Sequence, residues 1–373
     1  MRTMITGANI ILEKRMLANA TLYIEDNNII HIGMSTDSLV DWQYDEKIAA
    51  DGCFVFPGFI DLHVHGGNGA DVADLDSLAV EKLCQYHAQH GTTSLLLTTG
   101  PLLPDDYVPL LQSLAKEISR FPVRSGSYIR GIHLEGPFIS KHYAGAYRKE
   151  TIQEISMDVL LAYLSAAEGH IRVATLAPEL QGAEVAIKAL IARNIVVSAG
   201  HSNATYEEME QAIEWGVRQV THCYNAMRGF SHRDPGMLGS AWLNENVIAE
   251  YICDFVHSHP VSAKLLLQLK QPRKIALITD ASKMSGMQTE PIRNSAGTLA
   301  GSTITMGEAV KNAIVHLNVS PSEASIMASL TPAVVLGIDD RTGSIEVGKD
   351  ADLVVMDQNY KVLHTFVQGK RCI

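Results

Sequence analysis

Short apolar runs alternate with helix-like segments through the middle of the chain, and this alternation restricts the folds that the chain can adopt. The apolar runs predict eight strands, and each strand is joined to the next by a segment with helical periodicity. Strands that alternate with helices form parallel βαβ units, and eight such units close into a barrel. The candidate helices span residues 78–90, 107–119, 152–167, 180–193, 205–215 and 262–269.

The two ends of the chain have a different pattern. From about residue 4 to 56, and again near the C-terminus, short runs alternate apolar and polar residues between turn signals such as residues 25–28. This pattern is typical of antiparallel strands. We therefore expect an α/β protein in which a (β/α)8 TIM-like barrel, residues 57–335, carries a small β-sandwich domain built from residues 1–56 and 336–373.

Composition excludes several classes of partner. The 373 residues carry a formal net charge of −11, and an acidic surface is not attracted by nucleic-acid phosphates or anionic lipids. The apolar stretches are far shorter than the roughly 20 residues that a membrane span requires. The first residues lack a signal-peptide core, and the five cysteines form no Cys-x-x-Cys pair. We expect a cytoplasmic protein with reduced thiols and without nucleic-acid or membrane partners.

His63 and His65 come directly after the first predicted barrel strand, residues 58–62. In extended backbone, side chains at i and i+2 share a face, so both imidazoles point to one side and can hold a single ion. A pair of polar residues at a strand end, without a metal, is the alternative. Gly66 and Gly67 would let the backbone approach a bound ligand closely.

Glu135 ends the third predicted strand, just before Gly136 and Pro137. A carboxylate at the end of an apolar strand is costly to bury without a partner. A metal is one candidate partner, and a salt bridge to Arg130 or Arg148 is the other. His133 shares the face of Glu135 and either supports the site or belongs to the core.

Three further residues follow predicted strands: His201 the fifth, His222 the sixth and Asp280 the eighth. The carboxyl ends of barrel strands form the active face. A lone histidine is more often structural, but four imidazoles and a carboxylate at matching strand ends suit a two-metal site. Asp280 can bind metal, act as a general base, or do both, although a helix N-cap is its alternative role. The set predicts a metal-dependent hydrolase.

Segments in order along nearly the whole chain resemble one known family. Residues 57–66 resemble the opening signature of the amidohydrolase superfamily. More narrowly, the chain resembles N-acetylglucosamine-6-phosphate deacetylases, and the blocks Ala-Gly-His-Ser-Asn-Ala at 199–204 and Tyr-Asn-Ala-Met at 224–227 are specific to them. Further matching segments lie at 133–138, 176–179, 277–281, 299–306 and 343–353.

The resemblance implies a set of metal ligands. Glu135, His201 and His222 would hold one divalent ion, and His63 and His65 match the members that carry a second, with Glu135 bridging. We therefore expect two ions per subunit, Zn²⁺ before Fe, Mn or Co, which accept the same ligands.

The resemblance also implies a general base. Asp280 would take a proton from the attacking water and later give it to the leaving amine. Some branches of the superfamily bridge their metals with a carboxylated lysine after the fourth strand. The fourth predicted strand, residues 173–177, contains no lysine, which argues against those branches.

The resemblance places a sugar-phosphate pocket next to the metals. Arginine suits phosphate because its planar guanidinium donates two parallel hydrogen bonds. In the family, the matching arginine reaches the neighbouring subunit's substrate, so we expect a homodimer. A surface salt bridge between Arg233 and Asp234 is the alternative. The residues expected to contact substrate are Ala146, Asn225, Ala226, Arg233, His257, Ile304, Thr305 and Met306.

One position departs from the family pattern. Members often have a histidine near the substrate where this chain has Tyr147. A phenol donates a hydrogen bond but does not become cationic near neutral pH. Either Tyr147 replaces that histidine, or the loop serves another sugar.

Three functions follow from these patterns. The first is a deacetylase of N-acetylglucosamine 6-phosphate or of its galactosamine epimer. The second is an amidohydrolase that acts on another small amide, and the third is a metal-binding homologue without activity. Arg233 counts against the second, and the intact ligand set with Asp280 counts against the third.

Overall fold

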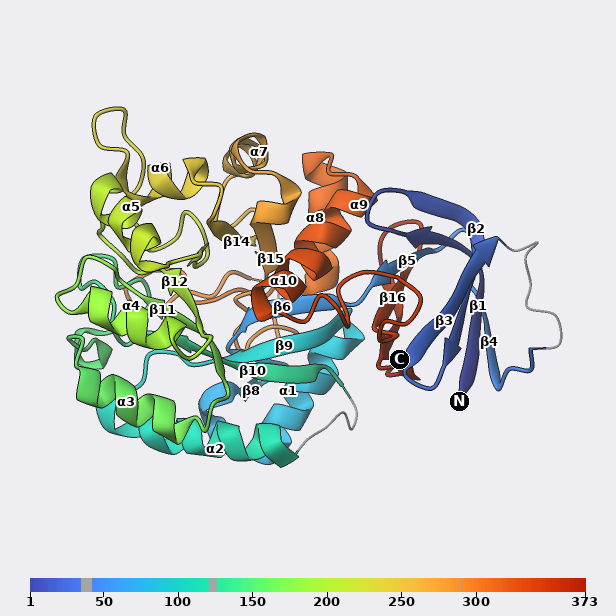
Figure 1. Ribbon diagram of the computed structural model, residues 1–373, viewed down its shortest axis with the longest axis horizontal. Helices are drawn as coiled ribbons and strands as arrows, with labels where there is room; N and C mark the ends of the chain where they lie inside the picture. The colour runs from blue at the N-terminus through green and yellow to red at the C-terminus, as the bar shows by residue number, and fades with distance from the viewer. Residues whose placement is uncertain (35–41, 121–125, 289) are drawn as a thin grey trace.

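The computed structural model describes residues 1–34, 42–120, 126–288 and 290–373, and it consists of two adjoining parts. Figure 1 shows a barrel surrounded by helices and, beside it, a sheet that contains both ends of the chain. This arrangement confirms the predicted fold class.

Within the described residues, eight parallel strands form the barrel and follow one another in chain order around it. The barrel closes between its last and first strands, where an isolated parallel bridge joins Ala281 to Val64. The carboxyl ends of the strands therefore meet around one mouth. The strands are β6 (Phe59–Val64), β9 (Thr92–Thr98), β10 (Tyr128–Glu135), β11 (Ile171–Leu176), β12 (Val196–Ala199), β13 (Gln219–Val220), β14 (Ile248–Ile252) and β15 (Ile275–Ile278).

Helices cover the outside of the barrel, as the alternating pattern predicted. A capping box starts α5, because Thr205 and Glu208 each accept a hydrogen bond from the other's backbone N–H. Helix α3 begins at Met157 rather than at residue 152, because Ser156 caps it. The helices are α1 (Ser77–Gln89), α2 (Tyr107–Arg120), α3 (Met157–Ala166), α4 (Ala183–Ile191), α5 (Tyr206–Trp215), α6 (Gly236–Leu243), α7 (Pro260–Leu269), α8 (Met306–Leu317), α9 (Pro321–Ser325) and α10 (Thr331–Leu336).

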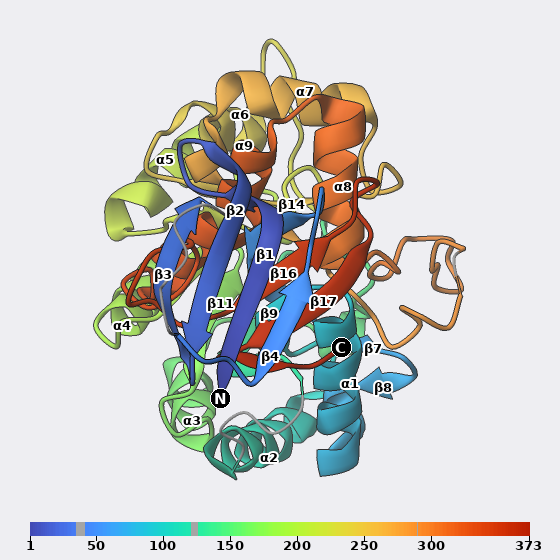
Figure 2. The same ribbon diagram turned by 90° about the vertical axis from the view of Figure 1, so that its right-hand side faces the viewer.

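The terminal strands form one mixed sheet, whose broad face is visible in Figure 2. The expectation of antiparallel strands was wrong for two pairings, since β1 pairs in parallel with both β4 and β5. A hairpin cannot make a parallel pair, so this pairing is invisible to a local pattern. The strands are β1 (Arg2–Ile11), β2 (Met16–Glu25), β3 (Asn28–Met34), β4 (Glu46–Ala49), β5 (Phe54–Pro57), β16 (Leu353–Met356), β17 (Val362–Val367) and β18 (Lys370–Arg371).

Each part has its own apolar cluster. The cluster of the terminal sheet joins residues from both ends of the chain, such as Ile10, Leu22 and Phe366, and all three are fully buried. The larger cluster fills the space between the barrel and its helices. Among the helices that the structure describes, none is long and apolar enough to cross a membrane.

Candidate active site and metal centre

A pocket of about 570 Å³ opens at the carboxyl ends of the barrel strands. All of the predicted metal ligands and the predicted base lie at this end of the barrel, and five of these six side chains line the pocket itself. His63 is the exception, because it is fully buried beneath His65. The residues lining the pocket from this set are His65, Glu135, His201, His222 and Asp280.

Left-handed backbone turns aim three of these side chains into the pocket. His201, His222 and Asp280 each lie just beyond a strand and have φ values of 48°, 33° and 50°. Residues other than glycine rarely adopt this region, and they do so mainly where surrounding structure enforces it at functional sites. The turns end the strands and direct the side chains inward.

Glu135, His201 and His222 form one compact group. Glu135 Oε1 lies 3.2 Å from Nε2 of each histidine, and the two Nε2 atoms are 3.1 Å apart. The alternative partners of Glu135 are engaged elsewhere, since Arg130 pairs with Asp352 and Arg148 with Glu150. The carboxylate therefore belongs to the histidine group.

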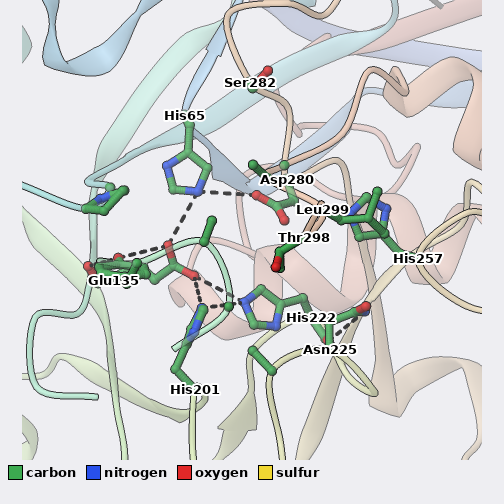
Figure 3. Close-up of a pocket in the computed structure, with 18 of the residues that line it drawn as sticks. His65, Glu135, His201, His222, Asn225, His257, Asp280, Ser282, Thr298 and Leu299 are labelled. Atoms are coloured by element: carbon green, nitrogen blue, oxygen red, sulfur yellow. Dashed lines mark hydrogen bonds and ion pairs between the residues drawn. The ribbon is translucent and has the colours of Figure 1, made fainter. Parts of the chain in front are cut away.

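His63, His65 and Asp280 form a second group beside the first. The two Nε2 atoms are 3.2 Å apart, and His65 Nε2 lies 3.2 Å from Asp280 Oδ1. Glu135 faces this group as well, with Oε2 3.4 Å from His65 Nε2. Figure 3 shows Glu135 between His65 on one side and His201 and His222 on the other.

The donor set fits divalent cations. Ligand atoms within each group lie within 4.8 Å of one another, and imidazole nitrogens face one another in each. Nitrogen lone pairs at such distances need a proton or a cation between them. Imidazole and carboxylate are ligands that zinc, iron, manganese and cobalt share.

The electrostatics of the site also favour positive charge between the carboxylates. Burial would raise the pKa of Glu135, but the charge of His63 and hydrogen bonds from His201 and His222 hold that pKa well below its ordinary value. Burial likewise opposes ionisation of Asp280, yet His63 and His65 lower its pKa. Both carboxylates are thus held ionised in a buried place, which requires a cationic partner.

Tyr147 contacts the centre of this site. Its hydroxyl donates to the backbone oxygen of Glu135 at 2.8 Å and lies 3.3 Å from Glu135 Oε2. Burial and the neighbouring Glu135 charge raise the pKa of Tyr147 well above its ordinary value. The phenol is therefore a neutral hydrogen-bond donor at the pocket wall.

The structure separates the other predicted substrate contacts into two sets. Ala146, Asn225, Ala226 and His257 line the pocket with Tyr147. The remaining four residues, Arg233, Ile304, Thr305 and Met306, do not line it.

The second set lies outside for three different reasons. Ile304 and Thr305 border a neighbouring cavity, and Thr305 caps α8. Met306 begins α8 and is fully buried in the core. Arg233 is exposed on a turn in which Ser231 and Asp234 pair, while Asp234 forms an ion pair with Arg228 rather than with Arg233.

Known proteins that are similar to this chain are amidohydrolases, as the metal-ligand set of the pocket predicted. The sequence model of the amidohydrolase family matches residues 54–372. The N-acetylglucosamine-6-phosphate deacetylase of Bacillus subtilis is 34% identical over 378 residues, which cover 96% of this chain and 94% of that protein. This chain belongs to the N-acetylglucosamine-6-phosphate deacetylase family of amidohydrolases.

Other relatives of this family support that assignment. The N-acetylgalactosamine-6-phosphate deacetylase of Escherichia coli O157:H7 is 35% identical, with 86% of this chain and 88% of that protein covered. The crystal structure of N-acetylglucosamine-6-phosphate deacetylase from Pasteurella multocida has a TM-score of 0.92 at 29% identity and covers 100% of this chain and 99% of that one. The whole two-part architecture is therefore common to this family.

A buried carboxylate that the sequence analysis did not predict, Glu250, contacts two of the predicted metal ligands. Glu250 on β14 is fully buried, and its Oε2 lies 3.2 Å from His63 Nδ1. Its Oε2 also accepts from the backbone N–H of His222 at 3.3 Å, and its Oε1 accepts from Gln219. A carboxylate within an apolar strand, the signal that identified Glu135, was present here too.

His133 belongs to the support of the site rather than to the pocket wall. Its Nδ1 lies 3.0 Å from the backbone oxygen of Leu62, and its Nε2 lies 2.7 Å from Thr175 Oγ1. Burial lowers the pKa of His133 to about 4, so the ring is neutral at physiological pH. Other pocket residues that sequence reasoning missed are Asp71, Ala73, residues 100–102, Gly145, Ser282, Arg293 and residues 298–301.

Proposed function

We propose that this protein hydrolyses the acetamide of N-acetyl-D-glucosamine 6-phosphate to glucosamine 6-phosphate and acetate. One observation carries the proposal: two histidine groups share Glu135 and meet Asp280 on the wall of a single pocket. The relatives named for this reaction match nearly the full chain.

Asp280 is the proton carrier of the proposed reaction. The oxygen of water adds to the acetamide carbonyl carbon while Asp280 accepts the proton that the water loses. When the carbon–nitrogen bond breaks, Asp280 returns that proton to the departing nitrogen, which leaves as the amine of the sugar. Asp280 Oδ1 lies 3.2 Å from His65 Nε2 on the pocket wall, so the carboxylate is within reach of a water bound in the pocket.

The metal ligands proposed are Glu135, His201 and His222 for one ion and His63, His65 and Asp280 for a second, with Glu135 bridging. Divalent ions at these ligands would supply polarisation of the acetamide carbonyl and would lower the pKa of the attacking water. Zinc is the first candidate, and iron, manganese and cobalt suit the same donors. Tyr147 donates its O–H to the backbone oxygen of Glu135, so it would hold Glu135 in position rather than bind the acetamide oxygen.

The phosphate end of the substrate would lie against Asn225, the backbone of Ala226 and His257. We also propose a homodimer in which Arg233 contacts the phosphate of the substrate bound in the neighbouring subunit. The reason is that its exposed turn does not line the pocket of its own chain. All five cysteines are free thiols, which suits a cytoplasmic enzyme.

A second substrate is favoured by a specific observation. Two relatives at 35% and 33% identity, from Escherichia coli O157:H7 and Shewanella, are N-acetylgalactosamine-6-phosphate deacetylases. The two sugars differ only at one ring carbon, so the same acetamide chemistry serves both.

Acetate release distinguishes these possibilities. Purified protein is given N-acetylglucosamine 6-phosphate, its galactosamine epimer and unphosphorylated N-acetylglucosamine, with and without a chelator. We expect the highest kcat/KM for the glucosamine phosphate and loss of turnover on chelation, reversed by added divalent metal. Preference for the epimer would select the second substrate, and no acetate from any of the three would contradict the proposal.

A further inference from the structure

One long segment, described over residues 281–288 and 290–305, borders the open side of the pocket; we call these residues the strap. It joins Asp280 to α8, and the orange loop beside α8 in Figure 2 is its outer part. Its ends are tied together next to Asp280, because Ser302 N–H donates to Asp280 O at 2.7 Å and Ser282 N–H donates to Ser302 O at 3.1 Å. The strap is thus anchored at the proposed base.

A small hairpin within the strap holds Arg293 at the pocket. Asn294 N–H donates to Thr298 O at 2.9 Å, and Asn294 Oδ1 accepts from the backbone N–H of Thr298 at 3.0 Å. The Arg293 side chain bonds the same hairpin, since Nη1 donates to Gly297 O at 2.7 Å. This contact uses one donor of the guanidinium, and the other donors are available for a ligand.

Among the residues that the structure describes, no carboxylate forms an ion pair with Arg293. Within the same residues, Arg293 is the single lysine or arginine that lines the pocket. The carboxylates Glu135 and Asp280 face the histidines instead. An uncompensated cation at the rim of a pocket in a chain of net charge −11 is a feature that favours an anionic ligand.

A second hydrogen-bond donor, His257, lines the same pocket as Arg293. Arg293 is close enough that its charge acts against protonation of His257. Asp254 holds the other side of that ring through a 2.6 Å contact with Nδ1. The imidazole and the guanidinium can both donate hydrogen bonds to an anion in this pocket.

We propose that Arg293 binds the substrate's phosphate from within the same chain, opposite His257, as a specificity-determining residue. This assignment rests on the proposed function, and it adds a cation to the phosphate end that does not depend on a second subunit. A guanidinium binds phosphate through charge-assisted and often bidentate hydrogen bonds. The strap therefore connects the proposed phosphate-binding Arg293, in its hairpin, to the proposed base Asp280, which directly precedes it in the chain.

The first test compares Arg293→Gln with Lys283→Gln. Lys283 is exposed on the same strap and does not line the pocket, so the control makes the same charge change away from the site. For the phosphorylated sugar, Arg293→Gln should raise KM about ten- to a hundredfold and leave kcat within about twofold, as expected for uniform binding. The control should match wild type, and Arg293→Lys should recover part of the loss.

Turnover of the unphosphorylated sugar gives the decisive contrast. Its KM should be the same in wild type and Arg293→Gln, because no phosphate is present. An unchanged KM for the phosphorylated sugar, or an equal rise for both sugars, would overturn the role assigned to Arg293.

Binding of glucose 6-phosphate, measured by calorimetry, separates this inference from the proposed function. This ligand carries the phosphate without an acetamide, so its affinity does not depend on deacetylation. We expect weaker binding in Arg293→Gln than in wild type or Lys283→Gln, even if the enzyme released no acetate from any sugar. No binding to wild type, or equal binding to all three proteins, would contradict the inference.

Mixed subunits distinguish Arg293 from Arg233. Chains with Arg233→Ala and chains with Asp280→Asn should restore activity on mixing, because one site would combine an intact Asp280 with the partner chain's arginine. At a substrate concentration far below the KM of Arg293→Gln, where this variant turns over slowly, mixing it with Asp280→Asn chains should add no activity, since each site would lack one group. Restoration in the second mixture would show that Arg293 acts between subunits and would refute the in-chain role.

Discussion

The terminal sheet and the mouth of the barrel bury very different residues. The sheet packs aliphatic and aromatic side chains from both chain ends, among them Ile5, Leu22 and Phe366, into an apolar cluster. The barrel mouth buries charged and titratable groups, including Glu135, His63 and Glu250. Burial of apolar groups stabilises the folded chain, whereas buried charges are unfavourable unless they are paired. The comparison therefore predicts that substitutions in the sheet act on stability and those in the mouth on chemistry.

Truncation in the sheet should have the largest effect on folding. Phe366 on β17 is fully buried, and Phe366→Ala should lower the free energy of unfolding by about 3–5 kcal/mol through lost burial and a cavity. Denaturant unfolding measures this change, and kcat per folded molecule should stay near wild type. Leu363→Ala, on the same strand and 38% exposed, should cost far less. A large fall in kcat in folded Phe366→Ala would break the proposed separation of roles.

At the barrel mouth, we expect a substitution to lower kcat strongly and to change stability little. Asp280→Asn keeps the shape of the side chain but removes its basicity, so kcat should fall by about a hundredfold or more. Unfolding should change little, and substrate binding should persist. Rapid kinetics together with metal analysis checks this. Near-normal kcat would place the base elsewhere, while loss of one ion would assign Asp280 mainly to metal binding.

The sequence predicted the residue types at the mouth better than their positions in space. Helix and strand periodicity is local, and so are the motifs that ended strands with His201, His222 and Asp280. The left-handed turns at these residues depend on packing against neighbouring strands, which a local pattern does not contain. Met306 was assigned to the pocket from a motif at 299–306, but only residues 299–301 of that motif line the pocket, and Met306 begins α8.

A smaller effect should come from the carboxylate beneath the ligands. Glu250 orients His63 through Nδ1, and outer partners of this kind typically change metal affinity by about ten- to a hundredfold when they are replaced. Glu250→Gln should therefore weaken one of two metal sites in a chelator competition. Glu117→Gln replaces another buried carboxylate, on α2, and should leave metal affinity unchanged. Equal metal loss in both variants would indicate a general folding defect instead.

The smallest expected effect is a shift in pH dependence at the phosphate end of the pocket. Burial would lower the pKa of His257, but the hydrogen bond and charge of Asp254 outweigh it and raise that pKa above its ordinary value. Protonated His257 attracts phosphate, so binding should be strongest below the raised pKa and weaken as pH rises through it.

Asp254→Asn removes the carboxylate charge that raises the pKa of His257. Binding of the phosphorylated sugar should then begin to weaken at a lower pH. The pH profile of log(kcat/KM) for the phosphorylated sugar should move to lower pH in Asp254→Asn relative to wild type. The profile for the unphosphorylated sugar should be the same in both proteins. Identical profiles for wild type and Asp254→Asn would remove His257 from phosphate binding and leave that end of the site to Arg293 and the backbone around Ala226.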